Sequence, residues 1–209
     1  MKSFLFGALT LVAAPALAVP SYQPVGPQTG VSLATVTGGG WTLCYSELMG
    51  TPFGISATTT LSGCTGDLIM LAGRATGSDT LLVLAQTTKA DALNATGAAD
   101  NGIFTTSNGA DWFYDDNYSW GFKPVGIPFT KFQCSFAPPD ASMCVHTLDF
   151  TGGFSINTIT VLNDSREYEK LVFVASGGQT VPEPATWALL ALGFGLVGGA
   201  FQRRMQAAA

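Results

Sequence analysis

The 209-residue chain is long enough for one domain with targeting segments, and only 11% of its residues are charged. Residues 19–182 hold 6 basic and 13 acidic side chains, a net charge of −7 within an overall −5. Because binding to nucleic acid needs clustered Lys and Arg, this acidic body excludes nucleic acid as a partner.

The first 18 residues have the organisation of a secretory signal peptide. Lys2 precedes an apolar run at 4–12, and the small residues Ala16 and Ala18 stand at −3 and −1 of a cleavage point. A membrane anchor is the alternative, but the apolar run is too short to cross about 30 Å of hydrocarbon. We therefore expect export through the secretion translocon and removal of residues 1–18 by signal peptidase.

Residues 19–175 are predicted to form an extracytoplasmic all-β domain, a sandwich or a jelly-roll-like pair of sheets. Short runs rich in Val, Ile, Thr, Leu and aromatic residues alternate with Gly, Pro, Asn and Asp. One short helix is expected at 89–98. The expected strands are 31–37, 41–48, 67–72, 80–87, 111–114, 118–122, 129–136, 144–150, 156–162 and 169–175.

Four cysteines in an exported chain predict disulfides, since the compartment is oxidising. Three connectivities are possible, and we favour the sequence-local pairs Cys44–Cys64 and Cys134–Cys144, which close loops of about 20 and 10 residues. Zinc is not expected, because no C-x-x-C spacing occurs and the only histidine is His146.

No complete catalytic constellation is present in the sequence. His146 is the only histidine that could act as a base, Cys144 is expected in a disulfide, and no G-x-S-x-G occurs. Aspartates in turns usually bond the backbone, although a glycosidase pair could be drawn from Asp111, Asp115, Asp116 and Asp149. We expect no enzyme, and a secreted hydrolase is the least favoured alternative.

The segment 111–120 concentrates aromatic rings around acidic residues. Such rings beside carboxylates are typical of sugar-binding sites, and the candidate glycan-binding residues are Trp112, Tyr114, Tyr118 and Trp120. Residues 115–117 also offer oxygen ligands for calcium, the one possible cofactor, without matching the calcium-loop pattern. The competing interpretation is a hairpin with Trp112 and Tyr114 on one face and Phe113 on the other.

The C-terminal part contains three features in order. A flexible linker at 176–180 leads into the segment 181–209, which begins with the extended motif Pro182, Glu183, Pro184. Residues 185–201 are expected to form a transmembrane helix with Trp187 at interface depth. The basic end, 202–209, contains Arg203 and Arg204, which favour the cytoplasmic side, so that the body faces outward.

This order of motif, apolar stretch and basic end resembles the PEP-CTERM sorting signal. The resemblance implies processing by exosortase, a membrane-embedded transpeptidase-like enzyme of Gram-negative bacteria that make exopolysaccharide and biofilm. It implies an inner-membrane-anchored precursor and then a product at the cell surface or outside the cell. Four strings of the body are similar to an uncharacterised exported bacterial domain: 41–46, 64–72, 77–81 and 118–122.

We therefore expect a surface or matrix protein with a structural or adhesive role, linked to exopolysaccharide and biofilm. The alternative is a carbohydrate-binding, lectin-like module. That alternative requires the four rings of the segment 111–120 to be exposed on one face.

Overall fold

The computed structural model describes residues 19–54, 56–97, 102–131, 134, 138–149 and 151–177. The predicted signal peptide and the segment 181–209 lie outside these residues. Residues Ala18–Gly177 form one compact unit. Among the residues described, no helix is long and apolar enough to cross a membrane.

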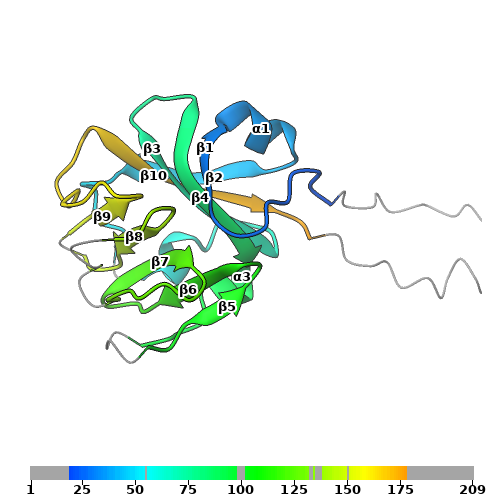
Figure 1. Cartoon of the computed structure of the whole chain (residues 1–209). Helices are drawn as coiled ribbons and strands as arrows, with labels where there is room; N and C mark the ends of the chain where they lie inside the picture. Colours follow the sequence, from blue (N-terminus) through cyan, green and yellow to red (C-terminus); the bar gives the residue numbers. More distant parts are fainter. Residues whose placement is uncertain are drawn as a thin grey trace, which may run out of the picture. The chain divides into compact units, whose positions relative to one another are not determined.

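The domain consists of two five-stranded antiparallel sheets (Figure 1), which confirms the predicted all-β class. The first sheet contains β1 (Gln28–Ser32), β4 (Thr80–Thr88), β3 (Leu68–Ala75), β10 (Tyr168–Ala175) and β2 (Thr42–Leu48), in that spatial order. The second contains β5 (Thr105–Ser107), β6 (Ala110–Tyr114), β7 (Ser119–Pro124), β8 (Met143–His146) and β9 (Gly153–Ile156).

In the described residues, three short helices lie between the strands: α1 (Leu33–Gly38), α2 (Ala57–Thr60) and α3 (Lys89–Ala92). Each begins where a hydroxyl side chain accepts a hydrogen bond from a backbone N–H of the first turn. The capping residues are Ser32, Ser56 and Thr88. The predicted strand 31–37 is therefore wrong over most of its length, because Ser32 ends β1 and caps α1.

Other differences from the predicted elements lie near turns and loops. The predicted helix 89–98 stops at Ala92. Phe129 and Lys131, in the predicted strand 129–136, are not in a strand, and β5 was not predicted. The predicted strand 144–150 corresponds to β8, which ends at His146, and the predicted strand 156–162 is wrong except at Ile156, because β9 covers Gly153–Ile156.

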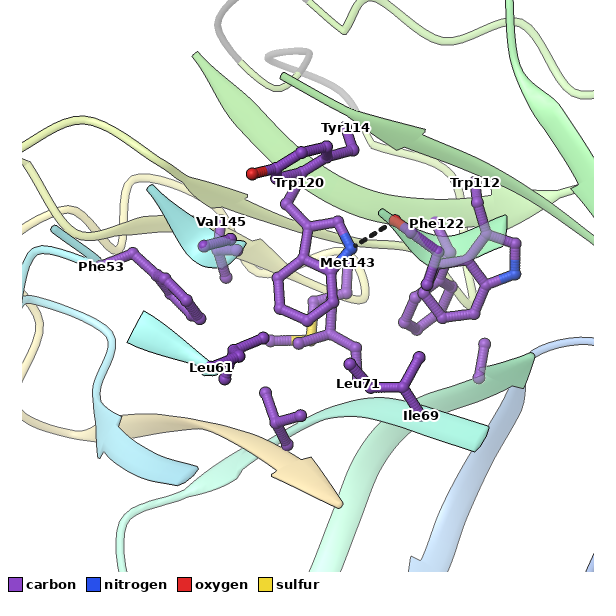
Figure 2. Close-up of a cluster of buried hydrophobic side chains, with 14 of the residues drawn as sticks. Phe53, Leu61, Ile69, Leu71, Trp112, Tyr114, Trp120, Phe122, Met143 and Val145 are labelled. Carbon is purple, nitrogen blue, oxygen red and sulfur yellow. Dashed lines mark hydrogen bonds between the residues drawn. The ribbon is translucent and has the colours of Figure 1, made fainter. Parts of the chain in front are cut away.

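The main core lies between the two sheets (Figure 2). Leu71 of β3 and Val172 of β10 face Trp112 of β6 and Trp120 of β7, and all four are fully buried. Alternate residues of a strand point to opposite faces, so Leu171 and Phe173 face the other way. There they pack with Val36 of α1, which covers the outer face of the first sheet.

Two disulfides stabilise the sandwich, and their pairing confirms the favoured connectivity. Cys44–Cys64 joins the edge strand β2 to the segment that follows α2. Cys134–Cys144 fastens the segment before β8 onto the outer face of the second sheet, beside Phe113 and Phe154.

The two ends of the described domain lie close together. Thr42 pairs with Val174 in the first sheet, and the neighbouring Trp41 donates its indole N–H to the Tyr22 carbonyl at 2.7 Å. The backbone N–H of Gly177 donates to the Asp67 carboxylate at 2.6 Å. The chain therefore enters and leaves the domain at the same end of β10.

Candidate functional site

The predicted sugar-binding rings do not form a binding surface. Trp112 and Trp120 are 0% exposed, Tyr114 is 3% exposed and only Tyr118, at 36%, reaches solvent. The Trp120 indole N–H donates to the Ala92 carbonyl at 3.0 Å inside the core (Figure 2). The prediction of a glycan site on these four rings is therefore wrong, because the hydrophobic effect has placed three of them between the sheets.

The same segment confirms the hairpin interpretation. Strands β6 and β7 pair antiparallel, with Trp112 opposite Phe122 and Tyr114 opposite Trp120. Trp112 and Tyr114 belong to the cluster between the sheets, whereas Phe113 packs on the outer face against Phe104 and Phe129.

The acidic residues of this hairpin make structural contacts. An Asp115 carboxylate oxygen accepts from the Asn117 backbone N–H at 2.9 Å, and Asp116 accepts from the Ser56 hydroxyl at 2.8 Å. In the described part of the chain, no three His, Cys, Asp or Glu side chains are grouped to hold a metal ion. Calcium binding at 115–117 stays a prediction.

Asp111, the first of the proposed glycosidase carboxylates, is committed to an ion pair. It lies 2.5 Å from Lys123 Nζ and also accepts from the Thr106 hydroxyl at 2.6 Å. Burial opposes ionisation of Asp111, but the hydrogen bonds and the charge of Lys123 outweigh it and lower the pKa of this carboxyl. Asp149, the last of the four candidates, is exposed.

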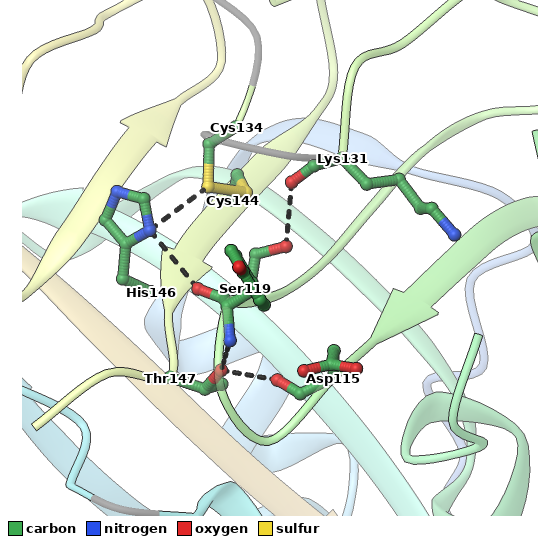
Figure 3. Close-up of a disulfide and its surroundings, with 8 residues drawn as sticks. Asp115, Ser119, Lys131, Cys134, Cys144, His146 and Thr147 are labelled. Atoms are coloured by element: carbon green, nitrogen blue, oxygen red, sulfur yellow. Dashed lines mark hydrogen bonds between the residues drawn. A yellow bond between two sulfur atoms is a disulfide. The ribbon is translucent and has the colours of Figure 1, made fainter. Parts of the chain in front are cut away.

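His146 lies at the end of β8 beside the Cys134–Cys144 disulfide (Figure 3). Its Nδ1 is 3.3 Å from the Tyr118 carbonyl and 3.9 Å from Cys134 Sγ. Because a carbonyl can only accept, Nδ1 carries a proton in this contact. Burial lowers the pKa of His146, and the Tyr118 hydrogen bond only partly offsets this.

Among the described residues, no nucleophilic side chain donates a hydrogen bond to His146. Cys144 is in the disulfide, and the neighbouring Ser119 hydroxyl donates to the Lys131 carbonyl at 2.9 Å instead (Figure 3). A nucleophile and base within hydrogen-bond reach is the minimum for covalent hydrolysis. The surroundings of His146 thus resemble a packed structural histidine.

The basic side chains of the domain are mostly used internally. Arg74 pairs with Glu169 at 2.6 Å. Each lysine Nζ donates to an internal acceptor: Lys89 to the Cys64 carbonyl, Lys123 to Asp111, Lys131 to the Thr96 and Ile103 carbonyls, and Lys170 to the carbonyls of Leu48, Met49 and Thr51. Arg166 alone among the described basic residues has an exposed side chain with no hydrogen bond or ion pair to another described residue.

Arg166 lines a candidate site, an open groove of about 470 Å³ between two loops. One wall follows β2 and the other precedes β10. The lining residues are Leu48, Gly50, Thr51, Pro52, Asp164, Ser165 and Arg166. The groove therefore offers apolar surface, hydroxyl groups, a carboxylate and a guanidinium.

Backbone contacts fix the two walls against each other. The Gly50 N–H donates to the Ser165 carbonyl at 2.8 Å, and the Met49 N–H donates to the Tyr168 carbonyl at 2.7 Å. A Cβ at Gly50 would lie 2.7 Å from the Asp164 backbone, so only glycine allows this approach. The floor of the groove is accordingly a rigid junction.

Lys170 supports this junction from inside the domain. It continues the inward-facing row of β10 beyond Val172, at the end of the core, and is fully buried. Its Nζ donates to the Leu48 carbonyl at 2.8 Å and to the Met49 carbonyl at 3.3 Å. Burial lowers the pKa of Lys170 to about 8, and the nearby charge of Glu47 acts in the opposite direction.

Sequence reasoning did not find this groove. Its walls come from segments more than a hundred positions apart, and neither contains an aromatic residue or a catalytic or metal-binding motif. The only signal was that two turn-forming strings, Gly50-Thr51-Pro52 and Asn163-Asp164-Ser165, flank predicted strands.

The fold and its bonds define a disulfide-stabilised, acidic β-sandwich. The family model of the PEP-CTERM protein-sorting motif matches residues 180–204, so the chain carries a PEP-CTERM sorting motif. This motif implies export and processing by exosortase from a membrane-anchored precursor. No curated protein and no solved structure matches the chain. The likeness of the body to an uncharacterised exported domain stays a prediction.

The matched span contains the predicted sorting residues Pro182, Glu183, Pro184, Trp187, Arg203 and Arg204. These residues lie outside the part that the structure describes, and so do Ala16 and Ala18 of the predicted signal-peptide cleavage point.

Proposed function

We propose that this protein is a non-enzymatic component of the cell surface or extracellular matrix, with a structural or adhesive role beside exopolysaccharide. The sorting motif supports delivery to that location. Two disulfides and inward-turned lysines suit a domain that must stay folded outside the cell.

One observation carries the non-enzymatic part of the proposal. The groups that a hydrolase would use are engaged in structural contacts, with Asp111 paired to Lys123 and the His146 ring against the Tyr118 carbonyl. A catalytic acid or base must instead reach a substrate proton.

Export and processing can be tested by mass spectrometry of extracellular and membrane fractions. The full chain would be expressed in a host with a matching exosortase and in its exosortase-deletion strain. We expect a C-terminus near Pro182–Pro184 only in the first strain. A variant with Pro182, Glu183 and Pro184 replaced by alanine should keep its tail in both strains.

The role itself is tested by deleting the gene and measuring matrix mass and cell cohesion. Less cohesive cells, restored by the wild-type chain, would support a structural or adhesive role. An unchanged matrix together with hydrolysis of a purified polysaccharide by the protein would contradict it. Restoration by the alanine motif variant would show that sorting is not needed for the role.

A further inference from the structure

We propose that the groove between residues 48–52 and 164–166 binds an acidic saccharide, with the Arg166 guanidinium paired to the carboxylate of a uronic acid unit. This inference rests on the proposed adhesive function and names its ligand class. The proposed carbohydrate site lies between the loop after β2 and the loop before β10, and not at the buried rings of β6 and β7.

The charge distribution points to Arg166. The other described basic side chains already have internal acceptors, so Arg166 is the cation left for a ligand. A guanidinium presents a planar fork of N–H groups that matches a carboxylate in bidentate geometry. The ligand should therefore carry a planar group with a single negative charge, such as a carboxylate.

The remaining lining groups fit the rest of a sugar ring. The exposed Asp164 carboxylate can accept from sugar hydroxyls, and the Thr51 and Ser165 hydroxyls can donate or accept. Leu48 and Pro52 supply apolar surface for the C–H groups of the ring. A simple anion would use only one of these features.

Asp164 also disfavours phosphate. With Arg166 it gives the groove a balanced formal charge, and a phosphate dianion would be repelled by the carboxylate more strongly than a uronate would. The acidic body adds the same bias, since its net charge is negative. A monoanion rich in hydroxyl groups is the better match.

The groove is built in advance of binding. Gly50 and Ser165 are joined by a backbone hydrogen bond, and Lys170 holds the carbonyls of the other wall from inside. A site that does not need to be ordered by its ligand loses less conformational entropy on binding. Such a site can bind a flexible saccharide with a small contact area.

The test is calorimetric titration of the exported protein, purified from the culture, with trigalacturonate, with the neutral sugar maltotriose and with inorganic phosphate. We expect binding of trigalacturonate and at least about tenfold weaker binding of the other two. Arg166→Gln should weaken trigalacturonate binding at least about tenfold, and Arg166→Lys should restore only part of it.

Glu167→Gln is the matched control, because Glu167 is an exposed neighbour that does not line the groove. It should bind trigalacturonate as tightly as the wild type, or slightly more tightly. Arg166→Gln should keep the wild-type melting temperature, since the side chain has no partner among the described residues. A fold defect therefore cannot account for lost binding.

Four results would overturn the inference: no binding of trigalacturonate, equal binding of maltotriose, unchanged binding by Arg166→Gln, or tighter binding of phosphate. Any of these could occur while deletion of the gene still weakens the matrix. In that case the proposed structural or adhesive function would stand and only the groove assignment would fail.

Discussion

Individual buried charges shape this domain more than its composition suggests. Lys170 lies in the inward row of β10 and reaches backbone carbonyls at the end of the core. The Leu48 and Met49 carbonyls also accept from the backbone N–H groups of Thr51 and Gly153, so removing Lys170 would leave only the Thr51 carbonyl without a donor among the described residues. An unsatisfied buried acceptor costs about 1–3 kcal/mol. The side chain therefore links the core of the sandwich to the wall of the groove.

Replacing Lys170 by Met should lower the free energy of unfolding at pH 7 by about 1–3 kcal/mol. Urea unfolding followed by tryptophan fluorescence measures this change. The half-buried Lys89 provides a comparison, since its Nζ donates to one carbonyl, that of Cys64, whereas Lys170 donates to three. Lys89→Met should therefore cost less. Equal stability of wild type and Lys170→Met would contradict the role.

The pH dependence of the same variant follows from the lowered pKa of Lys170. Its folded-state pKa of about 8 lies below the ordinary 10.5, so between these values the unfolded chain binds the extra proton. The free energy of unfolding of the wild type therefore rises from pH 8 to pH 10.5, and Lys170→Met lacks this contribution. The gap between the two proteins should widen with pH, and a narrowing gap would contradict the shift.

Asp111 changes the stability with the same sign as Lys170, but in the acid pH range. Its pKa in the folded state is below the ordinary value, so its stabilising effect is present above pH 4 and is lost as the pH falls through the folded pKa. Asp111→Asn should remove this part of the acid sensitivity and lower stability at neutral pH. Urea unfolding of the wild type and of Asp111→Asn at pH 7 and pH 3 measures this difference. If both proteins lost the same free energy of unfolding between pH 7 and pH 3, the Asp111–Lys123 pair would not be the cause.

At the scale of elements, the Cys44–Cys64 bond controls the loop that carries one groove wall. The bond closes 20 residues, including Gly50, Thr51 and Pro52. The double variant Cys44→Ala, Cys64→Ala should lose about 3 kcal/mol, measured by urea unfolding. The loop should also be cut faster by protease, with the cleavage sites read by mass spectrometry. Wild-type resistance to protease would contradict this role.

The sequence predicted best those strands that have turn signals at both ends. The prediction 80–87 for β4 falls within the observed Thr80–Thr88, because turn residues precede it and a helix cap follows. The prediction 31–37 failed because Val and Thr favour strands locally, while the Ser32 cap and the packing of Val36 favour a helix. Tertiary contacts decided between two acceptable local structures.

The candidate site could not be predicted because its parts meet only in the folded chain. Aromatic rings such as those of Trp112 and Trp120 are compatible with a sugar-binding surface or with a hydrophobic core. Alternation along a strand does not show which face is exposed to solvent. The groove depends on pairing of β2 with β10, which brings Leu48 beside Glu169 and the preceding turn. No local pattern encodes that pairing.

For the whole molecule, the groove lies at the opposite end of β10 from the exit of the chain. Residues 164–166 come just before Tyr168, the first residue of β10, and Gly177 follows its last residue. Eight residues at about 3.3 Å each separate these ends by about 26 Å. If the domain is attached through the residues after Gly177, the groove therefore lies at the end of β10 that is farther from the attachment point.

This arrangement predicts that the site of attachment decides whether a saccharide can bind. Protein captured on a sensor through a tag placed after Gly177 should bind trigalacturonate as it does in solution. Capture through a tag inserted in the turn 76–79 should reduce the binding capacity, because this turn lies at the groove end, where the Thr76 hydroxyl donates to the Arg166 carbonyl at 2.8 Å. Equal trigalacturonate-binding capacity in both orientations, with no binding by Arg166→Gln in either, would mean that the sensor surface does not cover the groove. The topological argument for an outward-facing site would then be wrong even though the site itself exists.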